Sequence, residues 1–133
     1  MAVHGPELVG RRFSSNREEL ISHSSVNIFA DAIGSHDSAV PPTYLITFSV
    51  KAAEEFLPTL GFDWSRVVHG EQRFLHVSEY QVGDVLKSTS EIESYKSMAG
   101  NEFVTIRTDF SNKATNQLVS STWATLVFRG EQS

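Results

Sequence analysis

The sequence of 133 residues contains no cysteine. This absence excludes disulfide bonds, metal sites built on thiolates and cysteine nucleophiles, and it fits a reducing compartment, so we expect a cytoplasmic protein. Long hydrophobic runs are also missing: no window of about 18 uncharged apolar residues exists, which predicts that no segment spans a membrane. The first residues, MAVHGPELVGRRF, lack the apolar stretch of a secretory signal peptide.

An excess of positive charge is missing as well. The formal net charge is -5 at pH 7, which argues against a nucleic-acid partner because such proteins usually carry a basic patch. The sequence holds no glycine-rich phosphate loop, and its histidines are not grouped with acidic residues in the manner of a metal site. We therefore expect neither a metal nor another cofactor. The hydrophobic fraction of 40% supports one folded domain over residues 1–133.

The strongest pattern lies in residues 41–60, PPTYLITFSVKAAEEFLPTL. Pro41 and Pro42 stop any earlier helix, and the Thr43 hydroxyl can cap a new one. Apolar side chains then recur at helical spacing at Leu45, Phe48, Ala52, Phe56 and Leu60. Further apolar residues widen this stripe almost all the way round, which predicts a helix over residues 43–60 that is enclosed by protein. Pro58 and Gly61 are expected to end it.

The rest of the chain predicts one shorter helix and a set of strands. The helix begins near residue 17 or 24 and ends at Ile33, with Gly34 as its C-cap. After the central helix the hydrophobic period changes to that of strands. Four strands are expected over residues 67–77, 85–95, 102–111 and 118–129, and short turns between them predict an antiparallel meander. The fold class is therefore α+β, with the long helix packed on one face of a curled sheet.

Five short motifs follow one another along the chain: AIG at residues 32–34, PPTYL at 41–45, RVVHGEQRF at 66–74, VGDVL at 82–86 and STWATLVFRG at 121–130. In this order they resemble the MaoC-like dehydratase N-terminal family, and are close to the actinobacterial non-catalytic subunits of (3R)-hydroxyacyl-carrier-protein dehydratase. The resemblance covers nearly the whole chain. It implies a hot-dog fold, with a five-stranded antiparallel sheet wrapped around a long central helix, and dimers in which two sheets join edge to edge.

The resemblance also implies chemistry on an acyl thioester of coenzyme A or of an acyl carrier protein. Hydratases of this superfamily carry an Asp and a His in a loop of the form G-D-x-N-P-x-H, because adding or removing water across a C=C bond needs an acid–base pair near the reacting carbons. A backbone N–H at the start of the central helix polarises the thioester carbonyl. By this likeness Pro42, Thr43 and Tyr44 are candidate substrate-binding residues.

The G-D-x-N-P-x-H motif itself is missing from this sequence. The matching segment is GSHDSAV at residues 34–40, in which His36 and Asp37 stand in the reverse order without the Asn-Pro pair. These two residues are either a displaced catalytic pair or polar residues of a surface loop. Adjacent residues seldom point at one substrate atom, so the loop interpretation is favoured.

His69, Gly70 and Glu71, on the strand after the helix, are the other candidate substrate-binding residues. In one interpretation, His69 or Glu71 contacts the pantetheine arm of the substrate or the partner subunit. In the other, which is favoured, they are polar residues of a sheet edge in which Gly70 forms a bulge. His76 falls on the opposite alternation from His69 and is expected to be a surface residue.

These observations favour a subunit of an acyl-thioester (3R)-hydroxyacyl dehydratase or enoyl hydratase of fatty-acid metabolism. In this hypothesis the chain supplies substrate channel and scaffold, and a hot-dog partner in a heterodimer or homodimer brings the catalytic Asp and His. Two alternatives stay open. One is a homo-oligomeric thioesterase or hydratase with a non-standard site, and the other is a non-enzymatic acyl-CoA binding module.

Overall fold

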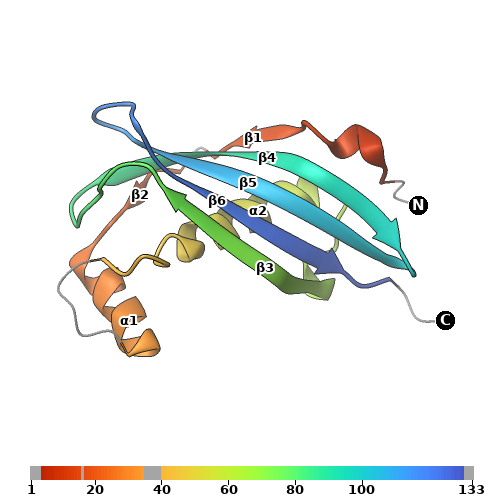
Figure 1. Cartoon of the computed structure of the whole chain (residues 1–133), viewed down its shortest axis with the longest axis horizontal. Helices are drawn as coiled ribbons and strands as arrows, with labels where there is room; N and C mark the ends of the chain where they lie inside the picture. The colour runs from red at the N-terminus through yellow and green to blue at the C-terminus, as the bar shows by residue number, and fades with distance from the viewer. Residues whose placement is uncertain (1–3, 16, 35–39, 131–133) are drawn as a thin grey trace.

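The computed structural model describes residues 4–15, 17–34 and 40–130. Its main body has two layers, a long curved sheet and, behind it in Figure 1, the helix α2 (Ile46–Thr59). The shorter helix α1 (His23–Ile33) lies at one end of the sheet (Figure 1). This arrangement confirms the predicted α+β class. Among the described helices, none is long and apolar enough to cross a membrane.

Helix α2 forms where its apolar stripe predicts it, but it begins at Ile46 rather than at Thr43. Thr43 is not its cap: the N-cap residue is Leu45, which makes no side-chain capping bond. The chain instead tightens through a turn, in which the N–H of Tyr44 donates to the carbonyl of Pro41 at 3.0 Å. The two prolines therefore prepare the helix through backbone geometry and not through a side-chain cap.

Gly61 closes the end of α2, and Pro58 lies inside its last turn. A proline there lacks the N–H that would bond to the carbonyl of Glu54, so it weakens that turn. Gly61 has a φ of 91°, a left-handed conformation that suits glycine. It lets the N–H of Phe62 return to the carbonyl of Leu57 at 3.2 Å, which closes the helix and directs the buried Phe62 into the core.

Helix α1 and two single turns of 3-10 helix complete the helical elements. Ser22 caps α1 by accepting a hydrogen bond from the N–H of Ser25, and Gly34 ends it as predicted. The first 3-10 turn, Pro6–Leu8, precedes the sheet, and the second, Trp64–Arg66, leads out of α2 toward the first long strand.

Within the described residues the sheet has six strands, one more than the resemblance implies. Four long strands follow α2: β3 (Val67–His76), β4 (Val85–Met98), β5 (Asn101–Asn112) and β6 (Leu118–Phe128). Two short strands, β1 (Arg12–Ser14) and β2 (Glu19–Leu20), precede it. All pairings are antiparallel. The additional strand arises because the N-terminal segment pairs with β4 at two separate places.

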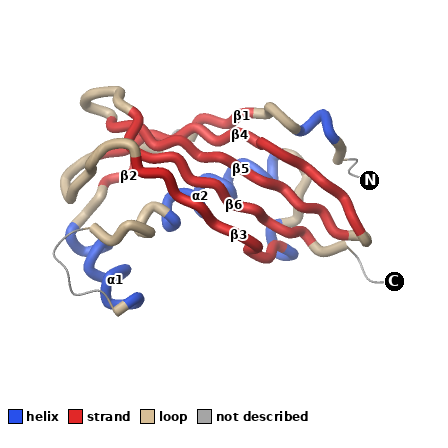
Figure 2. The backbone as a smooth tube through the Cα atoms, viewed as in Figure 1, coloured by secondary structure: helices blue, strands red, loops and turns tan. Residues whose placement is uncertain are grey.

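The strand order along the main path is β1-β4-β5-β6-β3, so the predicted meander is wrong for β3. Tight turns do join β4 to β5 and β5 to β6. The connection from β3 to β4, residues 77–84, is longer than a hairpin turn and lies at the end of the sheet near α1, and β3 pairs with β6 instead (Figure 2). β3 is therefore an edge strand, and no described strand covers its outer side.

Two apolar clusters fill the space between α2 and the sheet. One is centred on Phe56 of α2, and the other on Phe48 nearer the start of that helix. Between them, Ser90, Thr108 and Thr122 stand in register on three neighbouring strands and carry hydroxyls that are almost fully buried. Helix α2 is thus held along its length, and its first turn is fixed against the second cluster.

Candidate functional site

A pocket of about 720 Å³ opens beside the turn that precedes α2. Its lining comes from two parts of the chain that are distant in sequence. Val40 and Pro42 contribute from the turn, and residues 76–81 and 84 contribute from the end of β3 and the connection to β4. The long connection that places β3 at the sheet edge therefore also builds the wall of this pocket.

The turn before α2 presents an unpaired backbone donor. Because the N–H of Tyr44 bonds to Pro41, Pro42 and Thr43 are the two central residues of the turn. Thr43 is exposed, and its N–H has no hydrogen-bond partner among the described residues. Tyr44 is buried, and its hydroxyl lies 2.6 Å from the hydroxyl of Ser25 on α1. Of the three predicted substrate-binding residues here, Pro42 lines the pocket, Thr43 offers an N–H beside it without lining it, and Tyr44 packs in the core.

His76 connects the edge strand to this turn. Its Nε2 donates to the carbonyl of Pro42 at 2.7 Å, and its Nδ1 lies 2.9 Å from the hydroxyl of Ser120 on β6. Its ring lies between those of Phe74 and Tyr80, at centroid distances of 6.0 and 5.8 Å. His76 is exposed toward the pocket, but it is not the isolated surface residue that the strand alternation predicts.

The bulge at Gly70 explains why the alternation fails for His76. In the pairing with β6, His69 lies opposite Leu126 and His76 opposite Ser120, an even separation that places both histidines on the face toward α2. The register shift between His69 and Glu71 adds one residue to β3, so counting along β3 alone puts His76 on the wrong face. The predicted bulge is confirmed, and its consequence for His76 was missed.

The same bulge separates His69 from Glu71. His69 lies on the face toward α2 and is 3.1 Å from the side-chain oxygen of Gln72, whereas Glu71 lies on the opposite face, 3.6 Å from Arg73. A side chain at Gly70 would approach the carbonyl oxygen of Thr125 to 3.2 Å, which makes glycine well suited to the bulge. None of these three predicted substrate-binding residues lines the pocket beside α2.

His36 and Asp37, the two predicted catalytic candidates, lie outside the described residues. The titratable groups that do line the pocket are His76, Glu79, Tyr80 and Asp84. Burial, and then the charge of nearby Tyr44, raise the pKa of Tyr80 to about 12. Its phenol therefore stays protonated at neutral pH and acts in the pocket only as a hydrogen-bonding group. Asp84 accepts a bond from the N–H of Gln81 at 3.0 Å, which closes the turn between them.

Within the described part of the chain, no group of three or more His, Asp or Glu side chains lies close enough together to hold a metal ion. The candidate site thus consists of the pocket, the backbone donor beside it and the contacts of His76.

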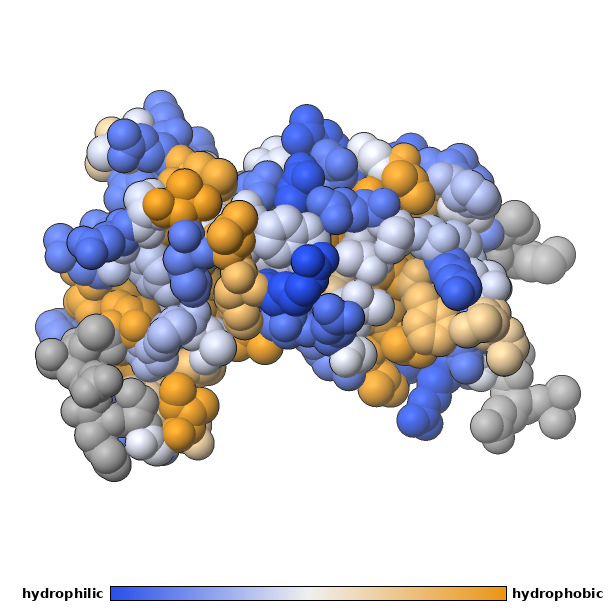
Figure 3. All heavy atoms as spheres, in the orientation of Figure 1, coloured by the Kyte–Doolittle hydropathy of each residue, from blue (hydrophilic) through white to orange (hydrophobic). Residues whose placement is uncertain are grey.

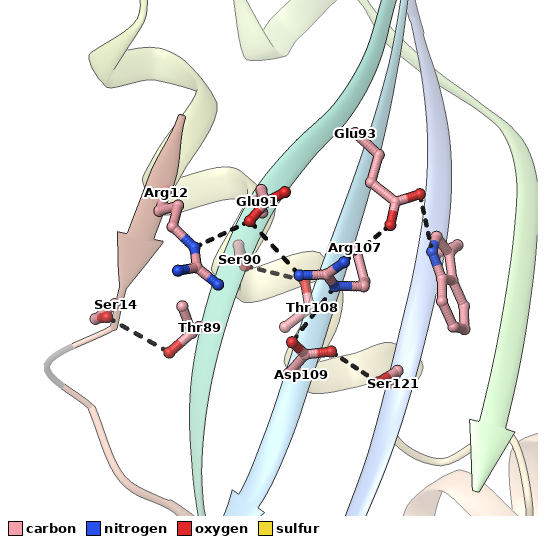
Figure 4. A network of polar contacts seen from close by, with 11 residues as sticks. Arg12, Ser14, Thr89, Ser90, Glu91, Glu93, Arg107, Thr108, Asp109 and Ser121 are labelled. Carbon is pink, nitrogen blue, oxygen red and sulfur yellow. Dashed lines mark hydrogen bonds and ion pairs between the residues drawn. The ribbon is translucent and has the colours of Figure 1, made fainter. Parts of the chain in front are cut away.

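The opposite face of the sheet carries a separate polar network centred on Arg107 of β5 (Figure 4). The Arg107 guanidinium lies 3.1 Å from Glu93, 3.4 Å from Asp109 and 3.5 Å from Glu91. The network continues outward to Arg12 beside Glu91, Ser121 beside Asp109 and Trp123 beside Glu93. Because every charge in it has a partner and α2 covers the other face, the network stabilises the sheet and is not part of the pocket.

Comparison with known proteins places the chain in a family. The family described as FAS1-like, dehydratase domain region, matches residues 30–121. A UPF0336 protein of Streptomyces coelicolor is 34% identical over 143 residues, covering 94% of this chain and 95% of that protein. A chain of the C-terminally truncated HadBC (3R-hydroxyacyl-ACP dehydratase) complex of Mycobacterium tuberculosis has a TM-score of 0.81 at 17% identity, covering 96% of this chain and 99% of that chain.

A structure described as a MaoC-like dehydratase has a TM-score of 0.79 at 18% identity, covering 92% of this chain and 42% of that chain. At identities of 17% and 18% the two solved structures are evidence of the fold alone, and they confirm the predicted hot-dog fold. The match to the family and the identity to the Streptomyces coelicolor protein show in addition to which family the chain belongs. This chain belongs to the FAS1-like dehydratase-region family and to the UPF0336 group of its relatives, and it has a hot-dog fold like that of the MaoC-like dehydratase.

Proposed function

We propose that this chain is a subunit of an acyl-thioester (3R)-hydroxyacyl dehydratase or enoyl hydratase, in which it supplies part of the substrate channel and a scaffold. The observation that carries the proposal is the pocket beside the start of α2, in a chain that belongs to a dehydratase family. The likeness to a chain of the HadBC complex supports a subunit role, because that structure is described as a complex of a (3R)-hydroxyacyl-ACP dehydratase.

The start of α2 suits a thioester oxygen. Dehydration and hydration of acyl thioesters pass through an enolate-like state, in which negative charge develops on the thioester oxygen. The N–H of Thr43 lies in the turn before α2, has no hydrogen-bond partner among the described residues, and is available to a thioester oxygen. Pro42 and Thr43 would hold the acyl thioester of coenzyme A or of a carrier protein, and Tyr44 would hold the turn in place from the core.

The sequence gives the reason for assigning catalysis to a partner. The G-D-x-N-P-x-H motif is missing, and both ring nitrogens of His76 are already engaged, so this histidine is not a free base. A hot-dog partner with the motif would bring the Asp and His. We place this partner along β3, whose outer edge no described strand covers, because unpaired strand edges are usually closed by another chain.

A second candidate is a hydratase with a non-standard site in this chain alone. It is favoured by the carboxylates of Glu79 and Asp84, which line the same pocket as His76. The adjacent His36 and Asp37 are the other possible acid–base groups for such an enzyme. Substitution of each of these carboxylates by its amide, and of His36 by Ala, tests this candidate directly.

The test of the proposed function is hydration of crotonyl-CoA, followed by loss of the enoyl-thioester absorbance. The rates of this chain alone, of a hot-dog protein with the motif alone, and of their mixture are compared. Loss of a general acid–base group commonly costs about a hundred- to ten-thousandfold in rate, so the chain alone should be slower than the mixture by such a factor. A chain that alone matches the mixture, or a mixture no faster than the partner alone, contradicts the subunit role.

A further inference from the structure

The hydrogen bonds of His76 fix its ring from two sides. A carbonyl oxygen only accepts hydrogen bonds, so Nε2 carries the proton that it shares with Pro42. Nδ1 meets the hydroxyl of Ser120, a residue with no exposed surface, and this hydroxyl also lies 3.2 Å from the carbonyl of Leu75. The Nδ1 side of the imidazole is thus anchored to β6, and its Nε2 side reaches the turn before α2.

The contact with Pro42 acts on the central peptide of that turn. A proline at the second position of a turn is compatible with two turn types, which differ in the orientation of the peptide between the second and third residues. Here this peptide joins Pro42 to Thr43, and the described residues contain no cis peptide. In a trans peptide the N–H points opposite to the C=O. By holding the Pro42 carbonyl, His76 therefore sets the direction of the Thr43 N–H.

A second feature favours the same orientation. The alternative turn type requires a positive φ at the third residue, which a β-branched residue resists, and Thr43 is not among the residues with a positive φ. The hydrogen bond from His76 also polarises the peptide, and a polarised peptide is a stronger donor through its N–H. The donor before α2 is therefore oriented before any ligand arrives.

We infer that His76 is a positioning residue of the candidate thioester site, which holds the Pro42–Thr43 peptide so that its N–H, directed away from His76, donates to the thioester oxygen. This inference rests on the proposed function. A donor that is oriented in advance stabilises developing charge without a cost of reorganisation. His76 itself transfers no proton in this arrangement, because its Nε2 proton is held by Pro42.

The test uses 4-(dimethylamino)cinnamoyl-CoA, whose long-wavelength absorption band moves further to the red when its thioester oxygen accepts a hydrogen bond. The full chain is titrated with this probe, and the band position at saturation is measured together with the dissociation constant. We expect a red shift with the wild type. In His76→Ala at least half of the shift should be lost, and the dissociation constant should rise about tenfold, as for one lost hydrogen bond.

His76→Gln is the matched variant, because its side-chain amide can still donate to the Pro42 carbonyl, and it should recover most of the red shift. A purely structural role would weaken binding without moving the band of the probe that is still bound. His23→Ala, on α1 and outside the pocket, is the control and should match the wild type. If His76→Ala fails to fold, the band position in His76→Gln decides the question.

The outcomes separate the inference from the proposed function. An unchanged red shift in His76→Ala overturns the role of His76 and leaves the thioester site intact. An unshifted band in His76→Gln likewise contradicts the rescue on which the role depends. A wild-type chain that neither binds the probe nor shifts its band overturns the thioester site, and the role of His76 falls with it.

Discussion

Arg107 holds three carboxylates together on the face of the sheet that points away from α2. Glu91, Glu93 and Asp109 all lie within 3.5 Å of its guanidinium, and their side chains are 25 to 34% exposed. A single exposed ion pair contributes little, but removal of a cation that is shared by three carboxylates leaves like charges close together. At the scale of residues, this is the position on the outer face where one charge matters most.

The first prediction is that Arg107→Ala lowers the free energy of unfolding by about 1 to 2 kcal/mol. The deficit should shrink at 1 M NaCl, because salt screens the repulsion that remains among the carboxylates. Urea unfolding at low and high salt measures both effects. Arg12→Ala is the matched control: the Arg12 side chain is 63% exposed and pairs, among the described residues, with Glu91 alone, so the loss should stay within about 0.5 kcal/mol. A deficit that does not respond to salt contradicts the electrostatic explanation.

Deprotonation of Tyr95 on β4 should change the free energy of unfolding with pH. Burial, and then its hydrogen bond to Glu102, raise the pKa of its phenol to about 12. The unfolded chain deprotonates near the ordinary value of 10. Because the folded value is the higher one, the stabilising effect of the neutral phenol is complete below pH 10 and is lost as the pH rises from about 10 to about 12.

We therefore expect Tyr95→Phe to be less stable than the wild type at pH 7 by about 1 kcal/mol, because its hydrogen bond to Glu102 is lost. Its stability should then fall less steeply than that of the wild type between pH 10 and 11. Urea unfolding at pH 7, 10 and 11 gives the comparison. Tyr80, whose pKa is also raised to about 12, is present in both proteins and cancels. If the free energies of unfolding of the two proteins fall in parallel with pH, the pKa of Tyr95 is not raised in the folded protein.

At the scale of elements, His4 ties the N-terminal segment to the end of α2 and to β5. Its Nε2 donates to the carbonyl of Leu60 at 2.8 Å, and its Nδ1 lies 2.6 Å from Glu102. Its ring stacks on Phe62 at a centroid distance of 3.9 Å, and its side chain is only 7% exposed. Three elements that are far apart in sequence thus meet at one imidazole.

His4→Ala should lower the free energy of unfolding by about 2 kcal/mol, because it leaves the partly buried Glu102 without its histidine partner and removes the stacking on Phe62. Thermal or urea unfolding measures the loss. His23→Ala, an exposed histidine at the first position of α1, is the control and should be nearly neutral. Equal stability of the two variants would mean that the contacts of His4 do not contribute to the stability of the fold.

At the scale of the whole molecule, the outer face of the sheet and its β3 edge differ in where they expose polar and apolar side chains. Figure 3 shows that the middle of the outer face is hydrophilic, with apolar side chains gathered to either side of it. On the edge strand β3, Val68 is 40% exposed and Leu75 is 56% exposed. An open strand edge with exposed apolar side chains is a common surface for pairing with another chain.

The prediction is that the protein forms dimers along β3 and that Leu75→Lys weakens them, because each added charge would lie on an exposed apolar surface that pairing along β3 would cover. Sedimentation velocity at micromolar concentration measures the fraction of dimer. Met98→Lys changes a residue of similar exposure, 51%, at the far end of β4 and should leave the dimer unchanged. A wild-type chain that stays monomeric at these concentrations contradicts the prediction, and so does an equal effect of both variants.

The elements that depend on neighbouring residues were predictable from the sequence. The helical spacing of Leu45, Phe48, Ala52 and Phe56 predicted α2, because residues three and four apart share a face whatever surrounds the helix. Gly34 and Gly61 marked two helix ends for an equally local reason, the left-handed backbone that each adopts. The four long strands followed from a period of two and from the turns between them.

What the sequence did not determine depends on pairing between distant segments. Whether β3 lies beside β4 or β6 is decided by contacts between residues about fifty positions apart, and local patterns do not report them. The direction of His76 depends on one extra residue at the Gly70 bulge, which reverses the alternation after it. Its partners Pro42 and Ser120 are brought to it by the turn before α2 and by β6, so the pocket and the oriented backbone donor beside it exist only in the tertiary structure.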